Sequence, residues 1–229
     1  MGSKNKLKRF KENESFANVI QPTREELLTG SFSHKGAWQY YFGNANPIVL
    51  ELGCGKGEYT IGLARKNPNT NYIGIDIKGA RFWRGAKTAL EEDLQNVAFV
   101  RAQIELLEYA FAAKEVSEIW ITFPDPQYKF KRVHHRLTNP TFLRSYRNVL
   151  KSDGCVHLKT DSAFLHGYTL GILDGWGISP KMAHHDVYQY VHAPEEVISI
   201  QTFYEQQYRQ KNIPITYLKF SFYTDVPTT

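Results

Sequence analysis

The stretch Pro47-Ile-Val-Leu-Glu-Leu-Gly-Cys-Gly-Lys-Gly-Glu58 decides the fold of this chain. Its apolar beginning, residues 47–52, has the length of a buried strand, and residues 59–66 have the periodicity of a helix. Three glycines lie between them at alternate positions: Gly53, Gly55 and Gly57. Because glycine lets a backbone turn sharply and approach a ligand closely, we expect a ligand-binding loop that joins a strand to a helix.

The rest of the chain alternates between short apolar runs and stretches with helical periodicity. Further strands are predicted over 71–75, 97–100, 118–122, 155–159, 181–190 and 215–223, and helices over 80–91, 105–112, 141–149, 163–173 and 200–211. Strands that alternate with helices indicate a parallel sheet with helices on both faces. A closing pair of strands often adds an antiparallel edge to such a sheet. We therefore predict an α/β protein with a mostly parallel, seven-stranded sheet.

Length and composition fit one globular domain. The chain has 229 residues, of which 42% are hydrophobic and 22% charged. We predict a single domain over 47–229, preceded by a basic N-terminal tail and lead-in segment over 1–46. The tail carries Lys4, Lys6, Lys8, Arg9 and Lys11. Charge alone leaves two interpretations open, a tail that lies on phosphates and a solvated, disordered terminus.

Simple counts exclude several other kinds of protein. Two cysteines, Cys54 and Cys155, are too few for a disulfide framework or a cysteine-based zinc site. No apolar run approaches the roughly 20 residues of a membrane helix, and no apolar segment follows the basic N-terminus as in a secretory signal. We expect a cytoplasmic protein without membrane attachment, either monomer or homodimer. The net charge of +5 permits a polyanionic partner.

Acidic residues around the glycine loop indicate which ligand it binds. Glu51 precedes the loop, Glu58 follows it, and Asp76 ends the second strand. Carboxylates would repel the pyrophosphate of a dinucleotide, and the spacing G-x-G-x-G departs from the dinucleotide pattern. The same carboxylates would attract the sulfonium and ammonium groups of S-adenosylmethionine, which we therefore favour over NAD. Taken alone, Asp76 would be interpreted as a helix cap.

Two further residues are placed to complete an adenosine pocket. An acid at the end of the second strand, here Asp76, commonly binds the ribose hydroxyls of an adenosine cofactor. Gln103 follows the third strand, where its amide oxygen could accept a hydrogen bond from the adenine amino group. An exposed loop glutamine is the competing interpretation.

A second unusual loop follows the fourth strand. It reads Thr122-Phe-Pro-Asp-Pro-Gln-Tyr-Lys-Phe-Lys-Arg-Val-His-His-Arg-Leu137. Ligands of open parallel sheets bind beyond the carboxyl ends of the strands, so we expect Asp125 at the edge of the cofactor pocket. Basic residues interleaved with aromatic ones suit RNA, because cations meet phosphates and rings stack on bases. We predict no metal site in this chain. His134 and His135 are adjacent and so would rarely point to one ion, and no carboxylate partner is evident beside them.

These motifs together resemble the bacterial tRNA (guanine-N7)-methyltransferases. The second loop is similar to the family signature F-x-D-P-W-P-K followed by basic residues and R-L. The other similar segments are 50–57 to the cofactor motif, Gly74-Ile-Asp76 to the second acid, His157-Leu-Lys-Thr-Asp161 to H-x-K-T-D, and Thr202-Phe-Tyr-Glu205 to T-x-x-E. The resemblance covers residues 47–220 in order. Gln127 and Tyr128 replace the usual Trp-Pro, Gln103 replaces an acid or asparagine, and Val133 interrupts the basic run.

The resemblance implies a Rossmann-like class I methyltransferase fold and a reaction. A methyl group would pass from S-adenosylmethionine to N7 of a guanine in the variable loop of tRNA, giving 7-methylguanosine. The implied catalytic residues are Asp125 and Asp161. The implied cofactor-binding residues are Glu51, Gly53, Gly55, Asp76, Gln103 and Asp125. The implied substrate-binding residues are Lys129, Asp161, Thr202 and Glu205, with Lys131, Arg132 and Arg136 on the RNA.

Alternatives stay open for the function and for one residue. Asp125-Pro-Gln-Tyr128 also resembles the D-P-P-Y motif of enzymes that methylate exocyclic amino groups of nucleic-acid bases, although its second proline is missing. A non-catalytic RNA-binding protein of the same fold is a further possibility, against which the intact glycines and acids of the cofactor loop argue. Asp161 could also serve as the N-cap of the helix that follows it.

Overall fold

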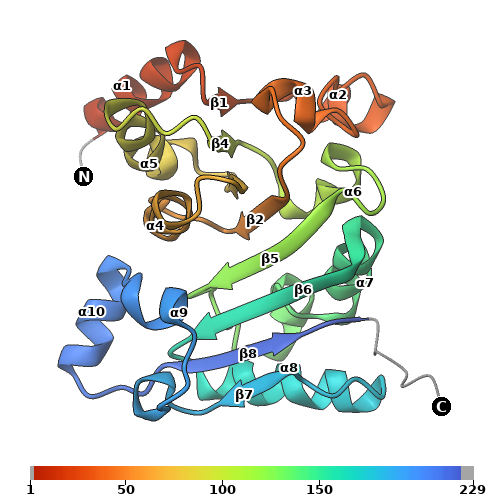
Figure 1. Ribbon diagram of the computed structural model, residues 1–229, viewed down its shortest axis with the longest axis vertical. Helices are drawn as coiled ribbons and strands as arrows, with labels where there is room; N and C mark the ends of the chain where they lie inside the picture. The colour runs from red at the N-terminus through yellow and green to blue at the C-terminus, as the bar shows by residue number, and fades with distance from the viewer. Residues whose placement is uncertain (1–2, 223–229) are drawn as a thin grey trace.

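An eight-stranded sheet organises the structure, a computed structural model that describes residues 3–222 (Figure 1). The strands are β1 (Val19–Ile20), β2 (Ile48–Leu52), β3 (Asn71–Ile75), β4 (Val97–Val100), β5 (Val116–Thr122), β6 (Leu150–Thr160), β7 (Met182–His184) and β8 (Thr216–Phe220). They lie in the order β1-β4-β3-β2-β5-β6-β8-β7. The pairs from β1 to β6 are parallel, and β8 is antiparallel to both β6 and β7. The predicted mostly parallel sheet with an antiparallel edge is confirmed.

The predicted count of seven strands is wrong, because β1 adds an eighth beside β4. The carbonyl of Asn18 accepts from the Phe99 amide at 2.8 Å, and that of Ile20 accepts from the Arg101 amide at 2.9 Å. Two residues carry no detectable periodicity, so only this pairing identifies the strand. The strand predicted over 181–190 is also shorter, because the 3₁₀ turn η3 (Val187–Gln189) follows β7. Residues 223–229, which include the end of the last predicted strand and of the predicted domain, lie outside the described residues.

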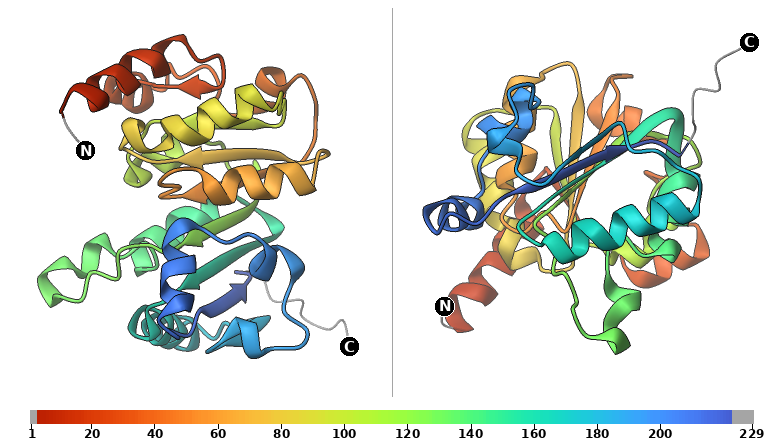
Figure 2. Two further views of the ribbon diagram at one scale, coloured as in Figure 1. Left: turned by 90° about the vertical axis from the view of Figure 1, so that its left-hand side faces the viewer. Right: turned by 90° about the horizontal axis from the view of Figure 1, so that it is seen from below.

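Helices cover both faces of the sheet, as predicted (Figure 2). One face carries α4 (Glu58–Lys66), α5 (Gly79–Glu91), α9 (Glu195–Ser199) and α10 (Phe203–Gln210). The other carries α2 (Arg24–Thr29), α3 (Trp38–Phe42), η1 (Ile104–Leu106), α6 (Leu107–Ala110), α7 (Pro140–Val149) and α8 (Ala163–Gly175). Neighbouring residues of a strand serve opposite faces, since Val49 packs with the first set and Leu50 with the second. Within residues 3–222, no helix is long and apolar enough to cross a membrane.

The segment before residue 47 contains regular structure that packs on the rest of the protein. Helix α1 (Ser3–Ser15) lies against α5, where the Asn13 side chain donates to the Gly79 carbonyl at 2.9 Å. Leu27 and Trp38 are buried in the core. The domain boundary at residue 46 stays a prediction, and the segment in front of it supplies a strand to the common sheet.

The carboxyl ends of β2 to β6 meet at one edge of the sheet. The glycine loop leaves β2 there, and the 123–137 loop, which contains the 3₁₀ turn η2 (Phe130–His135), leaves β5. Helix α10 borders the same edge, and the 123–137 loop extends away from the body of the molecule (Figure 2). This edge is where ligands of open α/β sheets bind.

Candidate active site

The glycine loop adopts a conformation that requires glycine at each of its three alternate positions. Gly53, Gly55 and Gly57 have φ angles of 73°, 57° and 75°, a region that side chains disfavour. A Cβ atom at Gly57 would lie 2.6 Å from the Phe99 ring. The loop can therefore pass close to β4 and to a ligand only without side chains at these positions.

Asp76 fastens this loop to the end of β3. Its Oδ2 accepts from the Gly55 amide at 3.1 Å, and its Oδ1 accepts from the Lys78 amide at 2.8 Å. The side chain is nearly buried, yet it borders a pocket beside the loop. Each carboxylate oxygen can accept more than one hydrogen bond, so Asp76 can still bind a ligand hydroxyl.

The pocket beside the glycine loop has a volume of about 220 Å³. Its polar residues include Asp76 and Gln103, and its apolar wall consists of Ile77, Ala102, Ile104, Leu137 and Phe142. Sites for drug-sized ligands usually measure roughly 300–1,000 Å³, so this pocket suits part of a cofactor. The apolar wall residues were not singled out by the sequence.

Gln103 lines the pocket, but its amide oxygen already has a partner. The Arg24 guanidinium donates to Gln103 Oε1 at 2.7 Å. Since Arg24 lies 79 positions away in the chain, this contact could not be predicted from the sequence. The oxygen that was expected to accept from adenine is therefore already paired with a cation.

Glu51 lies beneath the glycine loop and is almost completely buried. Its Oε1 accepts from the Thr122 hydroxyl at 2.6 Å, and its Oε2 accepts from the Thr60 amide at 2.8 Å and from the Thr60 hydroxyl. Burial raises the pKa of Glu51 to about 7, although these hydrogen bonds act in the opposite direction. Glu51 thus ties the start of α4 to the end of β5.

The turn after β5 is unusual in its backbone. Phe123 and Gln127 both have φ of 48°, which is rare for residues with large side chains. The exposed Asp125 accepts from the Gln127 amide at 3.0 Å through its own Oδ1. The carboxylate therefore shapes the turn and keeps its other oxygen available.

Arg136 supports this turn from inside, although the sequence predicted it on RNA. Its side chain is buried, and its guanidinium donates twice to the Gln127 carbonyl, at 3.2 and 3.1 Å. The same guanidinium stacks over Phe164 and Tyr168, at 4.7 and 4.4 Å from the ring centres. Burial and these contacts leave Arg136 without a surface that RNA could reach.

The other basic residues of the loop face outward. Lys129, Lys131 and Arg132 are exposed. Two aromatic residues stand beside them, Tyr128 with 66% and Phe130 with 88% of its surface exposed. Exposed rings next to cations form a surface that suits an unpaired nucleotide.

Asp161 follows β6 and is half-buried at the same edge of the sheet. Partial burial raises the pKa of its carboxyl group, and the Tyr208 hydroxyl lies beside it. The N-cap of α8 is Ser162, whose hydroxyl accepts from the Leu165 amide at 3.2 Å. The capping role considered for Asp161 is therefore wrong.

Thr202 and Glu205 begin α10 as a capping box, with each side chain bound to the other residue's amide. Glu205 is fully buried and forms an ion pair with Lys159 at 2.6 Å. Lys159 also donates to the carbonyls of Val197 and Ile200, and burial lowers its pKa to about 8. The predicted guanine contact of Glu205 is thus replaced in this structure by a contact that holds α9 and α10 on β6.

The fold defines the class of protein to which the chain belongs. A 16S rRNA methyltransferase, KamB, superimposes with a TM-score of 0.61 over 82% of this chain and 94% of its own, at 17% identity. An antibiotic-related methyltransferase gives a TM-score of 0.59 over 91% and 98%, at 18% identity. The fold is that of class I methyltransferases.

The family follows from sequence comparison. Residues 45–218 match the model of a family described as putative methyltransferase. A tRNA (guanine-N(7)-)-methyltransferase of Christiangramia forsetii is 68% identical over 96% of this chain and 99% of its own. Proteins of the same name from Bacteroides thetaiotaomicron and Listeria monocytogenes are 45% and 37% identical, over 95% and 82% of this chain and 85% and 86% of theirs. The chain belongs to the tRNA (guanine-N(7)-)-methyltransferase family.

Proposed function

We propose that this protein transfers a methyl group from S-adenosylmethionine to N7 of a guanine in the variable loop of tRNA, giving 7-methylguanosine. The observation that carries the proposal is the meeting of three features at one edge of the sheet. These are the pocket at the glycine loop, the half-buried Asp161, and the exposed basic and aromatic residues of the 123–137 loop. We propose a cytoplasmic location, because tRNA is the substrate.

The lining of the pocket supports one orientation of the cofactor in the proposal. Its adenine would lie against Ile77 and Leu137, with the ribose hydroxyls on Asp76. The backbone at Gly53 and Gly55 would border the amino-acid part, and Asp125 would face its cationic end. Glu51 would support this site from beneath the glycine loop, through the hydrogen bonds that it accepts from Thr60 and Thr122. S-adenosylmethionine, when bound, supplies an electrophilic methyl group on sulfur.

The reacting atom of guanine sets the task of the protein. N7 carries a lone pair and no proton, so no side chain has to act as a base, and the methylated purine is cationic. Holding N7 about 3 Å from the methyl carbon in line with sulfur is worth roughly 7–11 kcal/mol. The Asp161 carboxylate would stabilise the positive charge that develops on the purine.

The remaining residues would hold the RNA. Lys129 would bind a phosphate or the O6 edge of guanine, and Lys131 and Arg132 would bind phosphates. Thr202 would border the base, with Glu205 keeping α10 in place through Lys159. A stacked guanine must leave the stack to react, and Tyr128 and Phe130 offer rings for its neighbours.

The alternative of exocyclic amino methylation is not proposed. The relatives that resemble this chain over most of its length are named guanine-N7 enzymes. A non-catalytic role is disfavoured by the open pocket and by the left-handed glycines that border it.

Nucleoside analysis of tRNA from cells that lack this gene tests the proposal. We expect 7-methylguanosine to disappear and to return when the unaltered gene is supplied. Persistence of 7-methylguanosine in the deletion strain would refute the proposed reaction.

Cofactor binding can be tested separately by calorimetry. We expect Asp76→Ala to weaken binding of S-adenosylmethionine by roughly 1.5–3 kcal/mol, the value of a hydrogen bond to a charged group. Because Asp76 also holds Gly55 and Lys78, Asp76→Asn is the matched variant that retains an acceptor. An unchanged dissociation constant in Asp76→Ala, with tRNA binding intact, would remove Asp76 from the cofactor site.

A further inference from the structure

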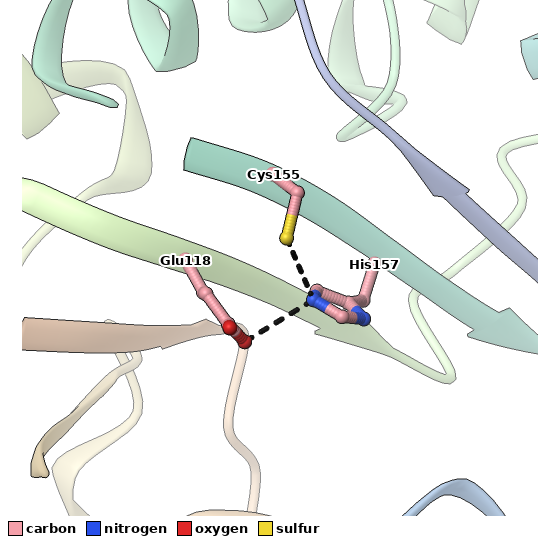
Figure 3. Close-up of side chains that lie close together, drawn as sticks. All are labelled: Glu118, Cys155 and His157. Atoms are coloured by element: carbon pink, nitrogen blue, oxygen red, sulfur yellow. Dashed lines mark hydrogen bonds and ion pairs between the residues drawn. The ribbon is translucent and has the colours of Figure 1, made fainter. Parts of the chain in front are cut away.

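We propose that Glu118, Cys155 and His157 form a zinc-binding site on the face of the sheet that carries α4, α5, α9 and α10 (Figure 3). One ligand atom from each residue, a carboxylate oxygen, Sγ and an imidazole nitrogen, lies within 4.8 Å of the other two. The site is separate from the cofactor pocket, whose lining includes none of the three. The proposal does not depend on the proposed reaction.

The sheet itself brings these residues together. Glu118 on β5 is the direct neighbour of Cys155 on β6, and Trp120 is the neighbour of His157. Cys155 and His157 are two positions apart on one strand, so their side chains lie on the same face. Two adjacent central strands therefore hold the donors in a fixed arrangement, without any flexible loop.

The distances converge on one atom of His157. Its Nε2 lies 3.1 Å from Cys155 Sγ and 3.2 Å from Glu118 Oε2 (Figure 3). Zinc ligands lie at about 2.3 Å for sulfur and 2.0–2.2 Å for nitrogen and oxygen, so an ion among the three needs only small side-chain shifts. A thiolate, an imidazole and a carboxylate are donors that zinc accepts.

The other side of the imidazole is held as in known zinc sites. His157 Nδ1 lies 2.8 Å from the Tyr217 hydroxyl, and the ring stacks on Trp120 with 3.8 Å between centres and 10° between planes. Outer contacts of this kind hold the ring in place, and the Tyr217 hydroxyl can accept from Nδ1 when Nε2 binds a metal. Burial also lowers the pKa of His157, so the ring is neutral as a ligand must be.

The protonation states of Glu118 and Cys155 determine which proton must leave when zinc binds. Burial opposes the charge on Glu118, but the hydrogen bond from His157 and the nearby Lys219 ammonium lower the pKa of Glu118 overall, so its carboxylate is ionised. The Cys155 thiol, whose pKa burial raises to about 11, has to lose its proton to water when a sulfur–zinc bond forms. Lys219 and Lys181 favour the thiolate and oppose the cation, so this site binds more weakly than a four-ligand structural site. The half-exposed Glu118 leaves room for water as the fourth ligand.

Equilibrium dialysis against micromolar Zn²⁺, followed by elemental analysis, tests the site. We expect one zinc per chain and a rise in melting temperature, because zinc would link β5 to β6. Co²⁺ in place of Zn²⁺ should give the near-ultraviolet absorption of a thiolate–cobalt bond. This measurement uses the unaltered protein, so misfolding of a variant cannot affect it.

Variants distinguish the site from adventitious binding. Cys155→Ser should abolish the cobalt–thiolate absorption, and Glu118→Gln, which replaces a half-exposed carboxylate with an isostere, should lower the zinc content to well below one. The control His134→Ala/His135→Ala removes two exposed histidines and should bind as the unaltered protein does. Absence of stoichiometric zinc in the unaltered protein, or binding lost only in the histidine control, would overturn the proposal.

Discussion

Asp161 offers the sharpest single-residue test of the reaction. Asparagine has the same shape but no full charge, and Ser162 keeps its own cap on α8, so Asp161→Asn should fold normally. We expect kcat and kcat/KM to fall together by more than tenfold, because the carboxylate acts on a charge that exists only in the transition state. Single-turnover rates at saturating tRNA and cofactor measure this. A rate within threefold of the unaltered enzyme, about 0.65 kcal/mol, would mean that Asp161 is not catalytic.

The pH dependence of turnover in the same variant provides a second test of the role of Asp161. Burial raises the pKa of Asp161 above the ordinary aspartate value, so turnover should increase as pH rises through that raised pKa. The asparagine variant cannot titrate there, and its profile should lose this limb.

Individual residues could be predicted only where local pattern determines their surroundings. The three glycines lie within a recognisable strand–loop–helix segment, and Asp76 comes at the end of the next strand. Their meeting at one loop was therefore predictable. Glu205 and Arg136 were not, because charge in a sequence does not reveal a distant partner. Glu205 meets Lys159 from 46 positions away, and Arg136 turns inward onto aromatic rings of α8.

At the scale of elements, the 123–137 loop should carry much of the salt dependence of tRNA binding. We expect Lys131→Gln/Arg132→Gln to reduce the slope of log K against log salt by roughly 0.7–0.9 per lost phosphate contact. Lys35→Gln/Lys114→Gln is the charge-matched control, at exposed positions before α3 and β5. Equal slopes for the two double variants would make the loop an ordinary solvated surface.

Arg136 should act on the shape of this loop. Lysine retains the charge but cannot donate twice to the Gln127 carbonyl or stack on two rings as a guanidinium does. Arg136→Lys should therefore leave the salt slope unchanged while lowering kcat/KM and increasing cleavage of the loop by proteases. If Arg136 bound RNA directly, Arg136→Ala would reduce the slope and Arg136→Lys would retain activity.

Elements were predictable in proportion to their length and periodicity. The strands β2, β3 and β4 and the helices α4, α5 and α8 lie within a few residues of their predicted bounds. The two-residue strand β1 is too short to show a period, and only its pairing with β4 defines it. The basic segment expected as a tail contains a helix, α1, whose contacts with α5 come from residues far along the chain.

For the whole molecule, Glu51 links stability to pH. Its folded pKa of about 7 lies above the ordinary value of 4.5, so its contribution is fully present below that value and is lost as pH rises through 7. Glu51→Gln should remove this loss, so its stability relative to the unaltered protein should increase between pH 5 and pH 8, by at most about 3 kcal/mol. Urea unfolding at both pH values measures the difference. The exposed Glu14→Gln should show no such change, and an equal pH response in Glu51→Gln and the unaltered protein would contradict the prediction.

The buried pair of Lys159 and Glu205 also has a consequence for how the protein is made. A ribosome adds Lys159 of β6 before it adds Glu205, which lies 46 residues further on. At roughly 5–20 residues per second, the interval lasts about 2–9 seconds. An ammonium group without its carboxylate is too costly to bury, so the Lys159 side chain must remain exposed to water during that time. The carboxyl end of β6, and Asp161 with it, can reach its final position only after Glu205 has been added to the chain.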